Sequence, residues 1–468
     1  MRLAQPNLPA IASLGVPVPR YERKSLEPRI LHLGVGGFHR AHMAVYTDET
    51  AAAGGVWGIR GVGLLDADRS MAETLHDQDC LYTVIERDRE GARPRVVGSI
   101  VDFVLAAGDD RTFAGLVANP TVSILSMTIT EGGYSIASDN PTIETIVSAL
   151  DARRRAGGHP LTILSCDNLP GNGDVARDAI TAVADSRSAD LCRYVETSCT
   201  FPNSMVDRIT PQTKDDDRAW LRDDVGIDDR WPVVCESFRQ WVIEDRFAAG
   251  RPRWEDVGAL FTDRVHDWEL YKLRMLNASH SCMAYLAALA GVVYVDEAMA
   301  IPVLRRYLEQ FLETEAIPTL MEIPGHPASN YAETVLRRFE NTGVRDQIAR
   351  LCIDGTAKFP SFLIPTVEAQ LDRGGHVACA ALALAAWSRY LATLPAAERA
   401  SDSRGERAAS LAGDSLAEPL RFLELDDVFT TRLRESEPFR AAFASACHEL
   451  DASGPLPAIE TNLSVDRR

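Results

Sequence analysis

Short β-rich runs alternate with helical patterns through the first half of the chain. Each run is bounded by Gly, Pro or Asp, and the runs are "RILHLGVGGF" (29–38), "GVWGIRGVGLL" (55–65), "VSILSMTIT" (122–130) and "LTILSCDN" (161–168). Helical patterns such as "HMAVYTDETAAA" (42–53) and "TIETIVSALDARRRA" (142–156) lie between several of them. Strands that alternate with helices favour a parallel sheet with helices on both faces. We therefore predict a doubly wound α/β domain.

The remaining pattern extends this picture and then changes. The runs "LYTVIERD" (81–88) and "RPRVVGSIVDFV" (93–104) are close enough to form an antiparallel addition to the sheet. From about residue 264 long helical patterns dominate, and the stretch 395–417 looks like an exposed excursion between helices. We predict an α/β domain over 1–263, followed by a mostly α-helical domain over 264–468.

Composition excludes several classes of protein. The formal net charge of −18 argues against a nucleic-acid partner. The nine cysteines occur singly, without a CxxC pair, which indicates a reducing, cytoplasmic compartment and provides no clustered zinc signature. No signal-peptide pattern opens the chain, and the most apolar segment, "VACAALALAAW" (377–387), is too short to span a bilayer and is typical of a core helix.

The first β-rich run ends in a glycine-rich turn, "ILHLGVGGFHRAH" (30–42), between a predicted strand and a helix. Gly34 and Gly36 take the first two positions of a GxGxxG pattern, in which one glycine turns the chain and the next lets backbone approach a pyrophosphate. His39 takes the third position, so the packing of helix on strand must tolerate a side chain there. Arg40 is placed to add charge to a phosphate-binding helix N-terminus. The turn predicts a Rossmann-like, dinucleotide-binding domain.

Acidic residues follow two of the predicted strands. Asp66 or Asp68, in "GVGLLDADR", is placed to bond ribose hydroxyls and to repel a 2′-phosphate, which favours NAD over NADP; Arg69 beside them weakens that preference. Glu131 lies at the end of another strand, where open α/β sheets place ligand-binding groups. The predicted cofactor is NAD. Its predicted contacts are Gly34, Gly36, Phe38, Arg40, Asp66 and Glu131.

A rare lysine marks the start of the helical half. The 49 basic residues include four lysines, Lys24, Lys214, Lys272 and Lys358. Unlike arginine, a lysine can lose its proton when desolvated, and a neutral lysine can take the proton of an alcohol. In "YKLRMLNASH" (271–280), at about 100° per residue of an α-helix, Asn277 lies about 140° and His280 about 80° around the axis from Lys272. Their axial spread of at most about 12 Å lets long side chains meet one small molecule.

Taken together, these motifs resemble the mannitol dehydrogenase family, the polyol-specific long-chain dehydrogenases/reductases. The matching segments cover nearly the whole chain and are "HLGVGGFHRAH", "GVGLLDADR", "TITEGGY", "SCDNLPGNG", "FPNSMVDRITP", "WELYKLRMLNASH" and "RLCIDGTAKFPSF". The spacing of the lysine, asparagine and histidine is specific in combination with "FPNSMVDRI". The resemblance implies metal-independent hydride transfer between NAD and a secondary alcohol.

The resemblance also implies catalytic roles for four residues. Lys272 resembles the general base, and Asn168 and Asn277 resemble the pair that stabilises the oxyanion. Glu269, one turn before Lys272, resembles the residue associated with the proton path of the lysine. Asp207, in "NSMVDRITP", is expected to make an architectural contact and is assigned no catalytic role.

Three further residues resemble substrate contacts: His280, Arg350 and Lys358. The site as a whole is expected in the cleft between the two domains, with the glycine turn and Asn168 on one side and Lys272 on the other. Burial there disfavours the charged form of the lysine, as its role as a base requires.

The implied reaction is the oxidation of a polyol to a ketose, with D-mannitol to D-fructose as the first choice. The second choice is a D-mannonate/D-fructuronate oxidoreductase, because that branch of the family shares the motifs. D-arabinitol and D-sorbitol also stay open, because nothing in the sequence fixes the substrate. A sensor of sugar or NADH without turnover is disfavoured by the intact lysine, asparagines and histidine, and a zinc-dependent alcohol dehydrogenase by the lack of clustered metal ligands. We expect a polyol or sugar-acid substrate, no metal, no nucleic-acid or membrane partner, and a monomer.

Overall fold

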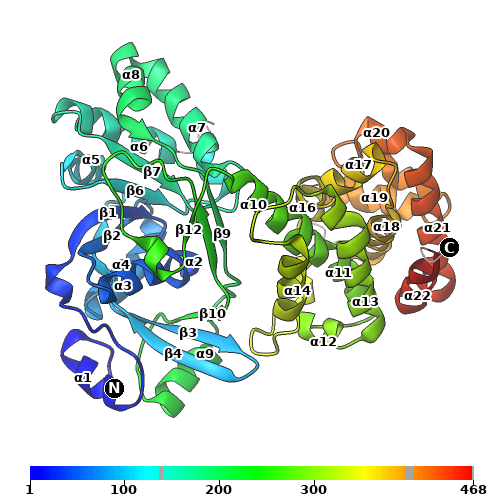
Figure 1. Cartoon of the computed structure of the whole chain (residues 1–468), viewed down its shortest axis with the longest axis horizontal. Helices are drawn as coiled ribbons and strands as arrows, with labels where there is room; N and C mark the ends of the chain where they lie inside the picture. Colours follow the sequence, from blue (N-terminus) through cyan, green and yellow to red (C-terminus); the bar gives the residue numbers. More distant parts are fainter. Residues whose placement is uncertain (136–140, 396–401, 403, 466–468) are drawn as a thin grey trace. The chain divides into compact units, whose positions relative to one another are not determined.

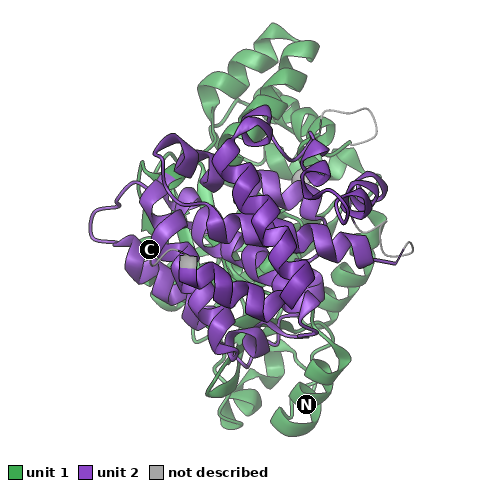
Figure 2. Cartoon of the chain, turned by 90° about the vertical axis from the view of Figure 1, so that its right-hand side faces the viewer, with its two compact units in different colours: residues 1–266 green, residues 267–468 purple. Residues whose placement is uncertain are grey.

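The computed structural model of the chain describes residues 1–135, 141–395, 402 and 404–465 (Figure 1). The chain divides into two compact units, Met1–His266 and Asp267–Arg468, which Figure 2 shows in different colours. Among the helices of the described residues, none combines the length and the apolar character that crossing a bilayer requires.

The first unit is built on a six-stranded parallel sheet (Figure 1). Its strands, in spatial order, are β5 (Ile100–Leu105), β2 (Trp57–Gly63), β1 (Glu27–Leu33), β6 (Ile124–Met127), β7 (Leu161–Ser165) and β8 (Cys199–Thr200). All neighbouring pairs are parallel, and Leu33 of β1 pairs with both Val62 and Met127. The predicted doubly wound sheet is confirmed. The strand order reverses between β1 and β6, and ligands bind at the carboxyl ends of the strands at such a point.

Successive side chains of the central strands enter two cores on opposite faces of the sheet. Ile30 of β1 and Ile124 of β6 belong to one core, whereas Leu31 and Leu125, next along each strand, belong to the other. Both faces are therefore covered, which is why these strands are continuous apolar runs. The first core is covered by α3 (Met43–Ala52) and α4 (Arg69–Asp77), and the second by α5 (Asp110–Ala118), α6 (Pro141–Arg155), α7 (Asn172–Arg187) and α8 (Ala189–Ser198).

Two small sheets and three short helices complete the first unit. One sheet consists of β10 (Val233–Glu236), β3 (Tyr82–Asp88) and β4 (Gly91–Val97), and the other of β12 (Leu260–Phe261), β11 (Gln240–Ile243) and β9 (Ser204–Asp207). The short helices are α1 (Leu8–Ser13), α2 (Gly37–Ala41) and α9 (Asp215–Trp220).

The predicted antiparallel pairing of β3 with β4 is confirmed. The prediction that this pair extends the main sheet is wrong, because the two strands form a separate sheet with β10. The run 93–104 contains two strands: β4 pairs with β3, and β5 joins the main sheet beside β2. The chain leaves β4 at Gly98, whose backbone N–H donates to the carboxylate of Asp48 at 2.8 Å instead of continuing a strand ladder.

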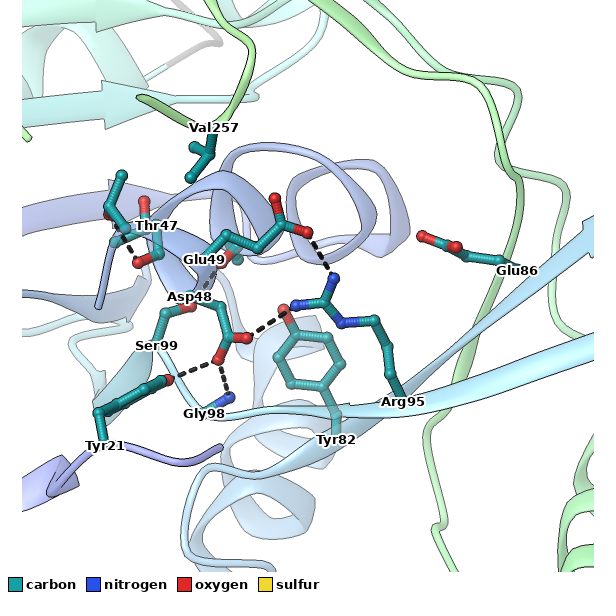
Figure 3. Close-up of polar contacts among 12 residues, drawn as sticks. Tyr21, Thr47, Asp48, Glu49, Tyr82, Glu86, Arg95, Gly98, Ser99 and Val257 are labelled. Carbon is teal, nitrogen blue, oxygen red and sulfur yellow. Dashed lines mark hydrogen bonds and ion pairs between the residues drawn. The ribbon is translucent and has the colours of Figure 1, made fainter. Parts of the chain in front are cut away.

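A buried cluster of charged side chains surrounds this break (Figure 3). The Asp48 carboxylate, 5% exposed, accepts hydrogen bonds from the Tyr21 hydroxyl at 2.5 Å and from Arg95 at 2.8 Å, besides the one from Gly98. Glu49 accepts from the second terminal nitrogen of Arg95 at 2.6 Å. Because each buried charge here has hydrogen-bonded partners, the cluster joins the N-terminal segment, α3 and β4 without leaving an unpaired ion.

The second unit is helical. The helix α10 (Val265–Tyr271) crosses the boundary between the two units. The α-helices after it are α11 (Ala278–Leu289), α12 (Val295–Met299), α13 (Pro302–Gln310), α14 (Ala328–Phe339), α15 (Ile348–Leu351), α16 (Gly355–Phe362), α17 (Ile364–Asp372), α18 (Ala378–Thr393), α19 (Gly405–Asp414), α20 (Thr431–Glu435), α21 (Glu437–Ser453) and α22 (Pro455–Val465). The predicted core helix is confirmed as α18, which is buried along most of its length between α11 and α21. Within the stretch 395–417, α19 buries Ala408 and Ala412, so the prediction of an exposed excursion is wrong there; 396–401 and 403 lie outside the described residues.

Candidate active site

The turn after β1 contains two glycines with different roles: one is required by the shape of the turn, and the other is exposed to solvent. Gly34 has φ +84°, and a Cβ atom there would lie 2.1 Å from the carbonyl oxygen of Thr128, so only glycine is accommodated. The Thr128 hydroxyl donates to the Gly34 carbonyl at 2.6 Å and fixes the turn against the end of β6. Gly36 is exposed, and the atom nearest to a Cβ built on it is 3.8 Å away. A ligand therefore has space to approach the chain at Gly36, although the N–H of Gly36 itself donates to the Gly34 carbonyl at 2.6 Å.

Two stacked histidines, one on β1 and one on α2, pack beside this turn. The ring of His39 lies on that of His32, with centroids 3.3 Å apart and planes at 15°. The His32 ring hydrogen-bonds the hydroxyls of Ser126 at 2.8 Å and Thr128 at 3.1 Å. Burial lowers the pKa of His32 to about 3 and holds the pKa of His39 well below its ordinary value, so both rings are neutral at physiological pH. The third glycine position is thus occupied by a flat ring that packs against a strand residue.

Arg40 and Phe38 lie on α2, directly after the turn. Arg40 is 2% exposed; it donates to the carbonyl oxygens of Trp231 and Gly36 and lies over the ring of Tyr82. Burial lowers the pKa of Arg40 to about 10. Phe38 is half-buried and stacks on His42, with centroids 4.9 Å apart. Arg40 supports the turn from inside, and its contact with a phosphate stays a prediction.

The two aspartates after β2 differ in their surroundings. The side chain of Asp66 is 89% exposed and meets Arg69 at 3.2 Å. Asp68 accepts from the backbone N–H of Leu65 at 3.0 Å, and its Cβ would lie 2.6 Å from a Cβ on Gly63. Asp68 is used to shape the strand end, which leaves Asp66 as the carboxylate available to a ligand.

Asn168 and Glu131 follow β7 and β6. Asn168 is exposed, two residues beyond the buried Cys166. Glu131 begins the short 3₁₀ helix η4 (Glu131–Tyr134), and its side chain lies outside the described part of the structure.

The segment from Lys272 to Asn277 is a π-helical turn between α10 and α11. The N–H of Ala278 donates to the carbonyl of Leu273, five residues earlier, as in a π-turn. Lys272 and Asn277 are also five residues apart, so they lie about one turn apart on the same side. The separation of about 140° expected for an α-helix is therefore wrong, because the extra residue in the turn changes the direction of every side chain after it.

Aromatic packing holds this turn in place. Tyr271 is buried, and its hydroxyl accepts from the N–H of Ile323 at 3.3 Å and donates to the carbonyl of His326 at 3.4 Å. Lys272 is 8% exposed and Glu269, one turn earlier in α10, is 5% exposed. His280, on α11, stacks on Phe339 of α14, with centroids 4.1 Å apart.

Arg350 and Lys358 lie close together in the second unit. The Arg350 Nε donates to Asp346 Oδ1 at 2.7 Å, and Nη2 pairs with Oδ2; this pairing raises the pKa of Arg350. The Lys358 ammonium donates to the carbonyl of Leu351 at 3.0 Å and to that of Arg350 at 3.5 Å. Burial lowers the pKa of Lys358, and the neighbouring Arg350 charge acts in the same direction. Within the described residues, no three His, Cys, Asp or Glu side chains are grouped to hold a metal ion.

Comparison with known proteins identifies the family. The model of the mannitol dehydrogenase Rossmann domain matches residues 28–256, and that of the mannitol dehydrogenase C-terminal domain matches residues 264–451. The chain belongs to the mannitol dehydrogenase family. The mannitol 2-dehydrogenase of Phaeosphaeria nodorum is 37% identical over 485 residues, covering 98% of this chain and 85% of that protein.

Two solved structures share the fold over nearly the whole chain. The Pseudomonas fluorescens mannitol 2-dehydrogenase, in a ternary complex with NAD and D-mannitol, is 38% identical and has a TM-score of 0.88, covering 99% of this chain and 100% of that one. A D-sorbitol dehydrogenase in substrate-free form is 32% identical with a TM-score of 0.87, covering 98% and 100%.

Sequence reasoning missed the residues that connect the strand ends of this mannitol dehydrogenase family member. His32, Thr128 and Asp167 hydrogen-bond across the ends of β1, β6 and β7. Each lies inside a segment that matches the family, but the sequence assigned none of them a role. For Asp167 the sequence also offered a positional signal, because this acid lies close behind a buried strand and directly before Asn168.

Proposed function

We propose that the chain oxidises D-mannitol to D-fructose with NAD as the hydride acceptor. Family membership supports an NAD-dependent dehydrogenase, and the relative solved with NAD and D-mannitol supports this substrate pair. The observation that carries the proposal is the π-turn, which sets an amine and an amide one turn apart in a largely buried helix. An acceptor for the alcohol proton and a donor to the alcohol oxygen are the groups that this oxidation needs.

In the proposed mechanism, Lys272 accepts the proton of the substrate hydroxyl as the hydride leaves the carbon that bears this hydroxyl. The amide of Asn277 donates to the substrate oxygen while that oxygen carries negative charge. Asn168 supplies a second amide, assigned on the motif it shares with the family. Glu269 receives the proton from Lys272 and passes it toward solvent, and His280, held by its stacking on Phe339, binds another substrate hydroxyl.

The first unit has the features that NAD requires. When bound, NAD supplies the nicotinamide ring that takes the hydride. The open space at Gly36 lets a pyrophosphate approach the turn closely, and the exposed carboxylate of Asp66 suits the two ribose hydroxyls. Phe38, Arg40 and Glu131 are proposed as further contacts on the motif alone.

The surroundings of Arg350 favour a neutral polyol over a sugar acid. Asp346 already neutralises the guanidinium through two hydrogen bonds, so a substrate carboxylate would meet a compensated cation and a nearby anion. A neutral hydroxyl needs a hydrogen-bond donor and no net charge. D-sorbitol is the second candidate substrate, because the D-sorbitol dehydrogenase structure matches the fold almost as well as the mannitol enzyme does.

We also propose a cytoplasmic, monomeric enzyme that needs no metal. All nine cysteines are free thiols and eight are buried, an arrangement typical of a reducing compartment. A lysine base removes the alcohol proton without assistance from a Lewis acid, so added metal has no step to accelerate.

The test is NADH formation with D-mannitol, D-sorbitol, D-arabinitol and D-mannonate, each with and without a chelator. We expect the highest kcat/KM with D-mannitol and no effect of the chelator. Higher kcat/KM with D-mannonate would contradict the argument from Arg350, and loss of activity that only added metal restores would contradict the role of Lys272. Sedimentation of the purified chain tests the monomer.

A further inference from the structure

A single buried carboxylate bridges the ends of two neighbouring strands in the first unit. Asp167 follows β7 and is 7% exposed. It accepts hydrogen bonds from the backbone N–H groups of Ile129 at 3.1 Å and Thr130 at 2.8 Å, and from the Tyr134 hydroxyl at 2.6 Å. All three donors belong to the segment after β6. Asp167 therefore fixes the position of that segment relative to the end of β7.

The segment that Asp167 holds contains a strained residue. Thr130 has φ +62° and ψ 170°, a region that β-branched residues rarely adopt. Such a conformation costs about 1–3 kcal/mol and persists only where surrounding contacts impose it. The hydrogen bond from the Thr130 N–H to Asp167 is one such contact. Strain of this kind is concentrated at ligand-binding sites.

The segment that Asp167 holds is also hydrogen-bonded to the dinucleotide turn. Thr128 donates through its hydroxyl to the Gly34 carbonyl at 2.6 Å and through its N–H to the Leu33 carbonyl at 2.9 Å. Two residues later, Thr130 is bound by Asp167. The order along the carboxyl edge of the sheet is thus the Gly34 turn, the segment after β6, and Asp167.

The main chain at Asp167 is fixed as well. Its carbonyl accepts from the Asn172 side-chain amide at 3.0 Å, and its N–H donates to the Ser165 hydroxyl at 3.3 Å. Asn168 is the next residue, so the fixed main chain at Asp167 also sets where Asn168 leaves the strand end. Burial raises the pKa of Asp167 against the opposing effect of its three hydrogen bonds, so a carboxylate at this place carries a desolvation cost that a neutral side chain would avoid.

We propose that Asp167 is a positioning residue that sets Asn168 relative to the dinucleotide turn, through the segment 128–130. The inference rests on the proposed function, since Asn168 is the group that it positions. Asp167 need not touch the substrate. Its effect is to keep the amide of Asn168 at the distance and angle where it donates to the substrate oxygen of a polyol.

Asp48 provides a matched control in the same unit. Like Asp167, it is a buried aspartate that accepts from a tyrosine hydroxyl and from a backbone N–H, as Figure 3 shows for Tyr21 and Gly98. It lies on α3 and joins α3 to β4, not the carboxyl ends of the central strands. Asp48→Asn therefore disturbs a similar set of hydrogen bonds and leaves unchanged those that connect the Gly34 turn, the segment 128–130 and Asp167.

The experiment compares Asp167→Asn with Asp48→Asn in the full-length protein. For Asp167→Asn we expect kcat for D-mannitol to fall roughly 10- to 100-fold, the cost of a small displacement of a reacting group. Its KM for D-mannitol and its thermal midpoint should change no more than those of Asp48→Asn, which should keep its kcat. Equal losses of kcat and thermal midpoint in the two variants would show an ordinary structural role and overturn the proposal.

A double substitution shows whether Asp167 acts through Asn168. If it does, Asp167→Asn should reduce kcat little further once Asn168→Ala is present, because the positioned group is gone. Losses that multiply would overturn the inference while leaving the proposed function intact. An Asn168→Ala variant with unchanged kcat would overturn both this inference and the role given to Asn168, whereas NADH formation by the unmodified protein tests the reaction itself.

Discussion

Asp346 and Arg350 form a two-point ion pair, in which Nε of the arginine donates to Oδ1 at 2.7 Å and Nη2 to Oδ2. The side chain of Asp346 is buried while about half of the arginine side chain is exposed, so the carboxylate is the fixed partner. A carboxylate held in this way determines how much positive charge Arg350 presents to a substrate. The pair therefore bears on the choice between a polyol and a sugar acid.

Asp346→Asn should shift the substrate preference toward D-mannonate. The substitution keeps the shape of the side chain and removes its charge, so Arg350 presents an uncompensated cation. We expect the ratio of kcat/KM for D-mannonate to that for D-mannitol to rise about 3- to 10-fold, a modest change because water screens a half-exposed arginine. Glu309→Gln, which removes the carboxylate of the Arg305–Glu309 pair on α13, is the control and should leave the ratio unchanged. An unchanged ratio in Asp346→Asn would contradict a contact between Arg350 and the substrate.

Lys272→Arg should abolish most oxidation, although it preserves the charge. Arginine cannot accept the alcohol proton, and loss of a general base typically costs about 10²–10⁴-fold in rate. In the unmodified protein kcat/KM for oxidation should rise with pH through one ionisation, which the variant should lack. Lys24→Arg, on an exposed lysine, should behave like the unmodified protein. Near-native activity of Lys272→Arg at neutral pH would exclude Lys272 as the base.

Asn277→Asp tests whether residue 277 lies one π-turn from Lys272. A carboxylate at that distance stabilises the ammonium form of Lys272, because opposite charges a few ångströms apart favour ionisation. The alkaline ionisation that controls oxidation should therefore move to higher pH in Asn277→Asp than in Asn277→Ala. Both variants should lose activity through the missing amide donor. Identical pH profiles for the two would place residue 277 away from the lysine, as in an uninterrupted α-helix.

Asp66→Ala should narrow the preference for NAD over NADP. The substitution removes both the hydrogen bonds to the ribose and the repulsion of a 2′-phosphate, and it leaves Arg69 to attract that phosphate. Asp68→Ala should instead lower the thermal midpoint, since Asp68 binds the backbone of Leu65. Kinetics with both cofactors and melting curves for both variants distinguish the two aspartates. A larger change of preference in Asp68→Ala would reverse their assignment.

The main sheet could be predicted from the sequence because its signals are local. Buried parallel strands are continuous apolar runs, and "ILSM" and "LTILS" need no distant information to be read as such. The division of 93–104 into two strands could not be predicted. It depends on Asp48 binding the N–H of Gly98, a contact between residues 50 positions apart.

The site was predictable in its residue types but not in its geometry. Lys272 and Asn277 stand out by chemistry, yet one extra residue in a helical turn leaves no mark on the apolar pattern around it, so the α-helical angle was the natural expectation. Asp167 was missed for a different reason. Its three donors belong to the segment after β6, more than 30 residues away in the chain. That segment lies beside Asp167 only because β6 and β7 are neighbours in the sheet.

Three neutral histidines near the dinucleotide turn should make the first unit sensitive to acid. Burial lowers the pKa of His32 and of His42 to about 3, and that of His39 falls well below its ordinary value. An unfolded histidine titrates near pH 6.5, so between that pH and about 3 the unfolded state binds more protons than the folded state. The stability that these neutral rings confer is therefore complete above pH 6.5 and is lost as the pH falls, by up to about 1.4 kcal/mol per pH unit for each histidine.

His39→Phe isolates one of these contributions, because a phenyl ring retains the stack on His32 and cannot be protonated. We expect its free energy of unfolding in urea to fall less steeply between pH 6 and pH 4.5 than that of the unmodified protein, by the share of one histidine. His448→Gln, at an exposed position on α21, should not change the slope. Parallel pH profiles for His39→Phe and the unmodified protein would mean that His39 already carries its proton in the folded state, and the neutral stack beneath Gly34 would then have to be abandoned.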